Sequence, residues 1–131
     1  MSSKYRAILV DDEPDVREVT KIALRRFGYP HVDDFKDGND AFDSYRNEPD
    51  SVKLIVTDMI MPGAKMNGEQ LIIGLKREGY QGKVVVISGM DYQTTRRKAD
   101  ELGVGKEIMG EVLSKPYDLF TEFKNAVTLD N

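Results

Sequence analysis

Residues 83–88, KVVVIS, decide the fold, because three valines and an isoleucine follow one another without polar alternation. An uninterrupted apolar run of this length is typical of a strand that helices cover on both faces, as in a parallel sheet. Residues 53–57, KLIVT, and residues 5–10, YRAILV, are predicted to be strands as well. Each of the three runs ends at a polar residue, so the sequence predicts buried strands that lead into polar loops.

Helical patterns alternate with these strands. From Pro14 onward, apolar residues recur at helical spacing until Gly28, a residue that suits a helix end. Asn67 and Gln70 resemble a capping box at the start of another helix. The remaining predicted elements are a short strand at 31–35, a helix around 41–45, a helix at 91–102, a short strand at 111–114, and a last helix bearing Leu119, Phe120, Phe123 and Val127.

Five strands, each followed by a helix, predict an α/β fold: a doubly wound, five-stranded parallel sheet with helices on both faces and right-handed crossovers. A chain of 131 residues suits one hydrophobic core. We therefore expect residues 1–131 to form a single domain.

Composition narrows the classes of function. The formal net charge of -4 argues against a protein that binds the phosphate backbone of nucleic acid directly. The absence of cysteine excludes disulfides and thiolate chemistry, and the apolar run at the N-terminus is too short for a signal peptide or a membrane span. We expect a cytoplasmic protein without membrane insertion.

Polar side chains follow four of the predicted strands. Asp11 and Asp12 follow the first strand, Asp58 the third, Ser88 the fourth and Lys115 the fifth. In open α/β sheets the ligand site lies beyond the carboxyl ends of the strands. The sequence therefore predicts that these five side chains meet at one edge of the sheet.

The residue types suit phosphoryl transfer. Three carboxylates at one place repel one another, and an all-oxygen site of this kind suits Mg²⁺, which is the expected cofactor. A carboxylate such as Asp58 can form an aspartyl phosphate when ammonium, hydroxyl and metal groups counter the phosphoryl charge. Each residue taken alone is more often an ordinary turn or surface residue. Their joint placement favours the functional interpretation.

The chain resembles the receiver domains of two-component response regulators over essentially its whole length. The resemblance is carried by Asp11-Asp12, the run Asp58-Met59-Ile60-Met61-Pro62, Gly68, Ser88-Gly89 and Lys115-Pro116. It implies the flavodoxin-like strand order 2-1-3-4-5. It also implies a signalling phosphoacceptor that is not an enzyme in its own right.

The resemblance implies a role for each site residue. Asp58 would accept the phosphoryl group, Asp12 and Asp58 would bind Mg²⁺ together with the backbone carbonyl of Ile60, and Asp11 would assist through water. Ser88 would hold a phosphoryl oxygen and Lys115 would pair with the phosphate. The implied partners are a histidine kinase or histidine phosphotransfer protein and a downstream protein target, with a phosphorylation-dependent dimer as another form of output.

Three departures from the family pattern affect mechanism. The loop from Asp58 to Gly68 is slightly longer than usual, which leaves the conformation of Gly63–Asn67 open, and the stretch Gly103–Gly110 lengthens the span before Lys115. Val112 stands three residues before that lysine, where the family often has tyrosine or phenylalanine. We therefore expect Gly103–Gly110 to replace the aromatic side chain as the moving part.

Two other classes of function remain as alternatives. An aspartate-nucleophile phosphatase would need a second acid two residues after Asp58, where Ile60 stands. A flavodoxin-like cofactor-binding module would need a phosphate cradle after the first strand, where Asp11-Asp12-Glu13 would repel the phosphate. Both alternatives are disfavoured.

Overall fold

The computed structural model describes residues 5–129, so residues 1–4 and 130–131 lie outside it. Its centre is a parallel sheet in the order β2-β1-β3-β4-β5. The strands are β1 (Arg6–Val10), β2 (Val32–Phe35), β3 (Val52–Asp58), β4 (Lys83–Ser88) and β5 (Met109–Ser114). The predicted fold class and strand order are confirmed.

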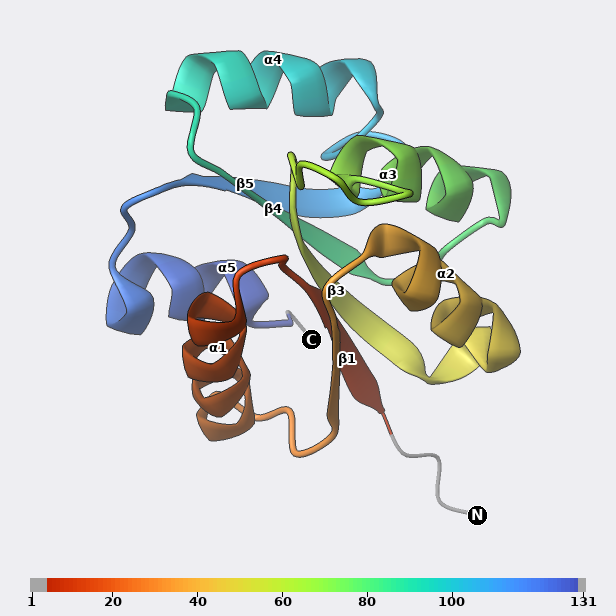
Figure 1. The fold of residues 1–131 in the computed structure, drawn as a ribbon, viewed down its shortest axis with the longest axis horizontal. Helices are drawn as coiled ribbons and strands as arrows, with labels where there is room; N and C mark the ends of the chain where they lie inside the picture. The colour runs from red at the N-terminus through yellow and green to blue at the C-terminus, as the bar shows by residue number, and fades with distance from the viewer. Residues whose placement is uncertain (1–4, 130–131) are drawn as a thin grey trace.

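Helices cover both faces of the sheet (Figure 1). They are α1 (Pro14–Arg26), α2 (Gly38–Asn47), α3 (Gly68–Arg77), α4 (Tyr92–Glu101) and α5 (Lys124–Val127), with a 3₁₀ turn η1 (Pro49–Ser51) and a π-helical turn η2 (Leu119–Phe123). α1 and α5 lie on one face, and α2, α3 and α4 lie on the other. No helix among residues 5–129 has the length and apolar character needed to cross a bilayer.

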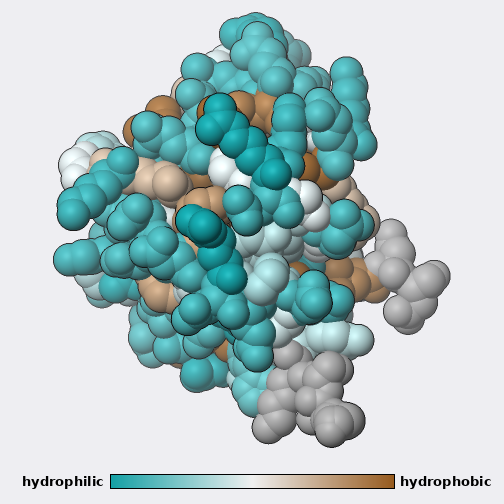
Figure 2. Space-filling view, turned by 90° about the vertical axis from the view of Figure 1, so that its right-hand side faces the viewer, coloured by the Kyte–Doolittle hydropathy of each residue, from teal (hydrophilic) through white to brown (hydrophobic). Residues whose placement is uncertain are grey.

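The central strands are buried on both sides, as their unbroken apolar runs predict. Every residue of β4 is buried, and its valines point alternately into the two hydrophobic clusters that flank the sheet. Phe123 is fully buried in the cluster under α1 and α5, and Leu75 is fully buried in the opposite cluster. Each large side chain removed from water contributes about 1.5–3 kcal/mol, so these two layers hold the strand ends in place. In contrast to this core, the molecular surface seen in Figure 2 is mainly hydrophilic.

Local signals in the sequence act as predicted at α1 and α3. The Asn67 side chain accepts a hydrogen bond from the Gln70 amide at 3.0 Å, and the Gln70 side chain accepts one from the Asn67 amide at 2.9 Å. This reciprocal pair is the capping box, and it starts α3 immediately after the loop that follows Asp58. α1 begins at Pro14 and ends just before Gly28.

The last helix differs from the sequence-based expectation. Only Lys124–Val127 is α-helical, and the preceding turn is π-helical, with the Phe123 amide bonded to the Asp118 carbonyl at 3.0 Å. The Asp118 side chain accepts from the amides of Phe120 and Thr121 and so caps this turn. Phe123 is buried, whereas Phe120, expected on the same helix, is 67% exposed.

The segment Gly103–Gly110 is a closed turn that leads into β5. The Ile108 amide donates to the Gly103 carbonyl at 2.9 Å, and Val104 and Ile108 are buried. Arg96 of α4 donates to the Val104 carbonyl at 2.7 Å. β5 begins at Met109, two residues earlier than the strand predicted at 111–114. The turn is thus attached to α4 by this hydrogen bond.

Candidate functional site

The carboxyl ends of four strands bring the predicted site residues to one cavity. This cavity has a volume of about 530 Å³ and lies at the edge of the sheet beyond β1, β3, β4 and β5. Its lining comprises Asp12, Glu13, Asp58, Ile60, Pro62, Ser88, Gly89, Met90 and Lys115. Asp11, the remaining predicted residue, is buried beside them.

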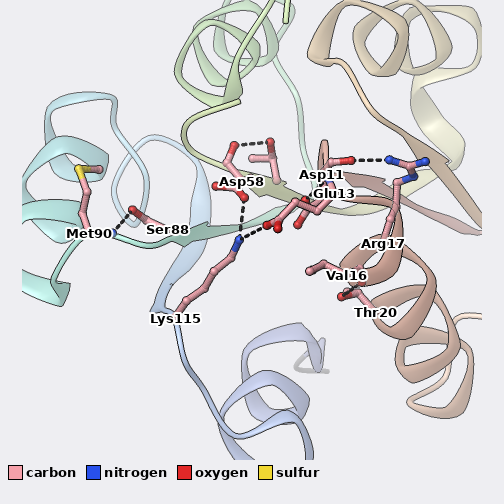
Figure 3. A network of polar contacts seen from close by, with 10 residues as sticks. Asp11, Glu13, Val16, Arg17, Thr20, Asp58, Ser88, Met90 and Lys115 are labelled. Carbon is pink, nitrogen blue, oxygen red and sulfur yellow. Dashed lines mark hydrogen bonds and ion pairs between the residues drawn. The ribbon is translucent and has the colours of Figure 1, made fainter. Parts of the chain in front are cut away.

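Asp58 is the centre of this site (Figure 3). It ends β3, is 7% exposed, and accepts a hydrogen bond from the Lys115 ammonium at 2.9 Å. Partial burial opposes the charge on Lys115, but the hydrogen bond to Asp58 and the negative charges of Asp58, Asp11 and Glu13 together outweigh burial and raise the pKa of Lys115. The lysine therefore stays cationic beside the carboxylate. One oxygen of Asp58 is paired and the cavity gives access to the residue.

Four carboxylates gather around this point. Oxygen atoms of Asp11, Asp12, Glu13 and Asp58 lie within 4.8 Å of one another. Burial raises the pKa of Asp11, and the neighbouring charges of Asp58 and Glu13 add to the effect, although the Glu13 amide and Lys115 lower it. Such crowding of negative charge is costly without a cation. An all-oxygen donor set at this spacing fits a hard divalent cation such as Mg²⁺.

Glu13 was not among the residues predicted to act at the site. Its carboxylate belongs to the acidic cluster and lies 3.7 Å from the Lys115 ammonium. The only signal in the sequence was its place directly after Asp11-Asp12.

Arg17 was also missing from the residues predicted to act at the site. Its guanidinium donates to the Asp11 carbonyl at 2.7 Å and pairs with Asp34 at 3.0 Å, which joins the ends of β1 and β2.

Ser88 and Lys115 are coupled through the backbone. The Lys115 amide donates to the Ser88 carbonyl at 2.8 Å, so the ends of β4 and β5 are held side by side. The Ser88 hydroxyl oxygen accepts from the Met90 amide at 2.9 Å. Its own hydrogen is left to donate to a group in the cavity. The structure thus brings a hydroxyl donor, an ammonium and a carboxylate together, each from a different strand.

Ile60 and Met90 form the apolar part of the lining. Ile60 follows β3 and its side chain is 51% exposed, whereas Met90 follows β4 and is half-buried. Val112, at the position that often holds an aromatic residue in the family, is buried in β5 and does not line the cavity.

Comparison with known proteins gives a consistent family match. The sequence model of the response regulator receiver domain matches residues 7–125. Response regulator GtcR of Aneurinibacillus migulanus is 32% identical over 111 residues, which cover 85% of this chain and 41% of that protein. The chain therefore spans less than half the length of this curated relative.

Solved structures show the same fold. A response regulator receiver domain protein from Clostridium thermocellum has a TM-score of 0.76 at 21% identity, with 93% of this chain and 90% of that chain covered. Chemotaxis protein CheY4 from Vibrio cholerae has a TM-score of 0.76 at 18% identity, with 93% and 95% covered. At these identities the likeness concerns the fold alone.

Proposed function

The chain belongs to the response regulator receiver domain family, and on this premise we propose that Asp58 accepts a phosphoryl group and that its phosphorylation switches the binding of a partner protein. The observation that carries the proposal is the pairing of a cavity-facing Asp58 carboxylate with the Lys115 ammonium at 2.9 Å inside an acidic cluster. Receiver domains are signalling phosphoacceptors. The alternative, a phosphatase of the aspartate-nucleophile type, is disfavoured because that class needs a second acid two residues after Asp58, where this chain has Ile60.

Each site residue has its own role in phosphoryl transfer. An oxygen of Asp58 attacks the donor's phosphorus, a P–O bond forms, and the bond to the leaving group breaks with its electron pair. Lys115 pairs with one oxygen of the transferred group and the Ser88 hydroxyl donates to another. Both donors are already held at the cavity by β4 and β5, so little reorganisation is needed.

We propose Mg²⁺ as the cation of the acidic cluster. Asp12, Asp58 and the backbone carbonyl of Ile60 would bind it directly, and Asp11 would assist through water, with Glu13 close enough to join them. The ion would neutralise charge on the phosphoryl oxygens.

The phosphoryl donor proposed for Asp58 is a histidine kinase or a histidine phosphotransfer protein, and the receiver of the signal is a downstream protein or a second copy of this chain. We propose that residues 1–131 act as one domain in the cytoplasm. The match covers 41% of the relative GtcR. The partner that receives the signal is therefore proposed here for this chain alone.

The test of the proposed function is direct labelling. Incubation with a small-molecule phosphodonor and Mg²⁺ should add the mass of one acid-labile phosphoryl group to the intact protein. Intact-mass spectrometry would detect it, and a chain that gains no mass under conditions that label another receiver domain would contradict the proposal.

Magnesium should stabilise the fold at neutral pH. Because the pKa of Asp11 is raised in the folded protein, its charged form destabilises the native state, and stability falls as the pH rises from the unfolded pKa through the raised folded pKa. A cation bound at the acidic cluster would offset this loss of stability. At about ten times its Kd, Mg²⁺ should add about 1.4 kcal/mol, or about 5 °C in Tm for a domain of this size.

Thermal unfolding with and without Mg²⁺ would measure this effect, with Ca²⁺-free buffer and chelator as the baseline. Asp11→Asn should raise the Tm of the metal-free protein and reduce the gain from Mg²⁺. The gain should also shrink as the pH falls into the range where carboxylates protonate. A gain that is unchanged in Asp11→Asn would argue against Asp11 as part of the cation site.

Lys115→Ala should uncouple the phosphoryl site from the far side of the fold. Phosphorylation adds about -1.5 to -2 charges at Asp58, and Lys115 is the cation placed to follow that charge. Its amide is bonded to Ser88, which leads through Met90 into α4. A phosphoryl mimic should therefore shift backbone NMR signals over residues 91–114 in the unmodified protein, and these distant shifts should be lost in the variant.

We propose that α4, β5 and α5 form the surface that contacts the partner, and the same spectra test this proposal. The closed turn Gly103–Gly110 should shift together with α4, since Arg96 bonds to the Val104 carbonyl. Shifts that remain confined to residues near Asp12 and Asp58 in the unmodified protein would mean that the signal leaves through another face.

A further inference from the structure

Asp37 joins two segments that are distant in sequence. One of its carboxylate oxygens accepts from the Asn39 amide at 2.8 Å and caps α2. The same carboxylate accepts from the Lys65 amide at 2.9 Å and the Met66 amide at 3.3 Å, which belong to the loop between β3 and α3. Partial burial opposes its charge, but the three amides outweigh burial and lower the pKa of Asp37. It therefore stays an anionic acceptor.

The contact is reciprocal. The Gly38 amide donates to the Met66 carbonyl at 2.9 Å. A Cβ atom at position 38 would lie 2.5 Å from that carbonyl oxygen, so only glycine allows the loop to approach α2 this closely. Figure 1 shows the loop beside the first turn of α2. We call the contacts of Asp37 and Gly38 with Lys65 and Met66 the clasp.

The clasp differs from the other helix caps of the structure. Asp91 and Asp118 also cap their helices with side-chain oxygens, but each bonds only to amides or hydroxyls of its own helix. Among the side-chain caps in residues 5–129, Asp37 is the one that also binds a separate loop. A cap alone would not need those two bonds.

The loop that the clasp holds is part of the wall around Asp58. Its base is closed by the Gly68 amide, which donates to the Met59 carbonyl at 3.2 Å, and by the buried Met61 side chain. Between base and clasp, Ile60 and Pro62 line the phosphoacceptor cavity. Pro62 also lines a neighbouring hollow of about 220 Å³ that reaches Asp37. Movement of the clasped end would therefore shift Pro62 and open the cavity on this side.

We propose that Asp37 is a positioning residue that holds this loop in place beside Asp58 and thereby lengthens the life of the aspartyl phosphate. The inference rests on the proposed function. In hydrolysis, a water oxygen bonds to phosphorus, the bond between phosphorus and Asp58 breaks with its electron pair going to the carboxylate, and the water proton passes to solvent. With the loop held in place, the apolar side chains of Ile60 and Pro62 at the cavity wall limit the approach of that water.

Asp37→Ser separates the clasp from the cap. Serine caps helices about as well as aspartate, but its single short oxygen cannot also reach the Lys65 amide. A hydrogen bond of this kind shifts an opening equilibrium by about fivefold, so loss of the phosphoryl label should be about fivefold faster than in the unmodified protein. Amide hydrogen exchange at Lys65 and Met66 should accelerate even without phosphorylation, while helical circular dichroism stays unchanged.

Two further variants complete the experiment. Asp37→Ala should match Asp37→Ser in label lifetime but be less stable, because it also loses the cap. Asp118→Ser alters a cap outside the cavity and should leave the lifetime as it is. Unmodified protein that takes no label would overturn the proposed function and this inference together. A label that is lost at the same rate in Asp37→Ser, or that is lost equally fast in Asp118→Ser, would overturn the inference alone.

Discussion

Asp58→Asn is expected to abolish phosphoryl uptake. An amide has no anionic oxygen to attack phosphorus, and the substitution also removes the charge that pairs with Lys115 at 2.9 Å. We expect that the other carboxylates of the cluster do not take over, because Lys115 donates its hydrogen bond to Asp58 at 2.9 Å and lies farther, at 3.7 Å, from Glu13. Intact-mass spectrometry after treatment with a small phosphodonor and Mg²⁺ should show no added mass.

The loss should not come from misfolding. Replacing one of four crowded carboxylates by a neutral side chain relieves repulsion, so the metal-free variant should be at least as thermally stable as the unmodified protein. Asp43→Asn is a matched control, since Asp43 is an exposed residue of α2 outside the acidic cluster, and it should label fully. Full labelling of Asp58→Asn would show that another residue is the acceptor.

The double substitution Ile60→Asn and Met90→Glu should shorten the life of the phosphoryl group by about tenfold. Both residues line the cavity beside Asp58, and we expect a hydrolytic water to reach the phosphoryl group past their apolar side chains. Polar side chains there can hold and orient that water, and positioned groups of this kind commonly accelerate proton transfer by more than tenfold. The decay of label after removal of the donor would measure the lifetime.

The control keeps the cavity apolar. Ile60→Val with Met90→Leu preserves the character of both side chains and should leave the lifetime within about twofold of the original, since such swaps of similar volume are well tolerated. Equal decay in the polar and apolar double variants would mean that these two positions do not govern access of water. A long lifetime of the phosphoryl group would then be explained by the clasp at Asp37 instead.

Much of the molecule could be predicted from the sequence because the signals were local. The run at 83–88 shows a strand buried on both faces, and the pairing of Asn67 with Gln70 shows a helix start, without reference to any other segment. The meeting of Asp58 and Lys115 was also predictable, since the carboxyl ends of parallel strands share one edge. The conformation of the Gly103–Gly110 turn could not be predicted in this way. Gly103–Gly110 suggested a loose segment, whereas buried Val104 and Ile108 make it a closed turn.

The sequence by itself thus determined the order of the strands' apolar runs, the acidic and basic residues that end them, and the family to which the chain belongs. The tertiary structure alone decided which of those residues touch. Glu13 approaches Lys115, Arg17 bonds to the end of β1, and Asp37 holds a loop that begins more than twenty residues later in the chain. The physical reason is that periodicity and propensity report on neighbours along the chain, while these contacts depend on how helices and loops pack across the sheet. Nothing in the local sequence of Asp37 distinguishes a simple helix cap from a clasp on the phosphoacceptor loop.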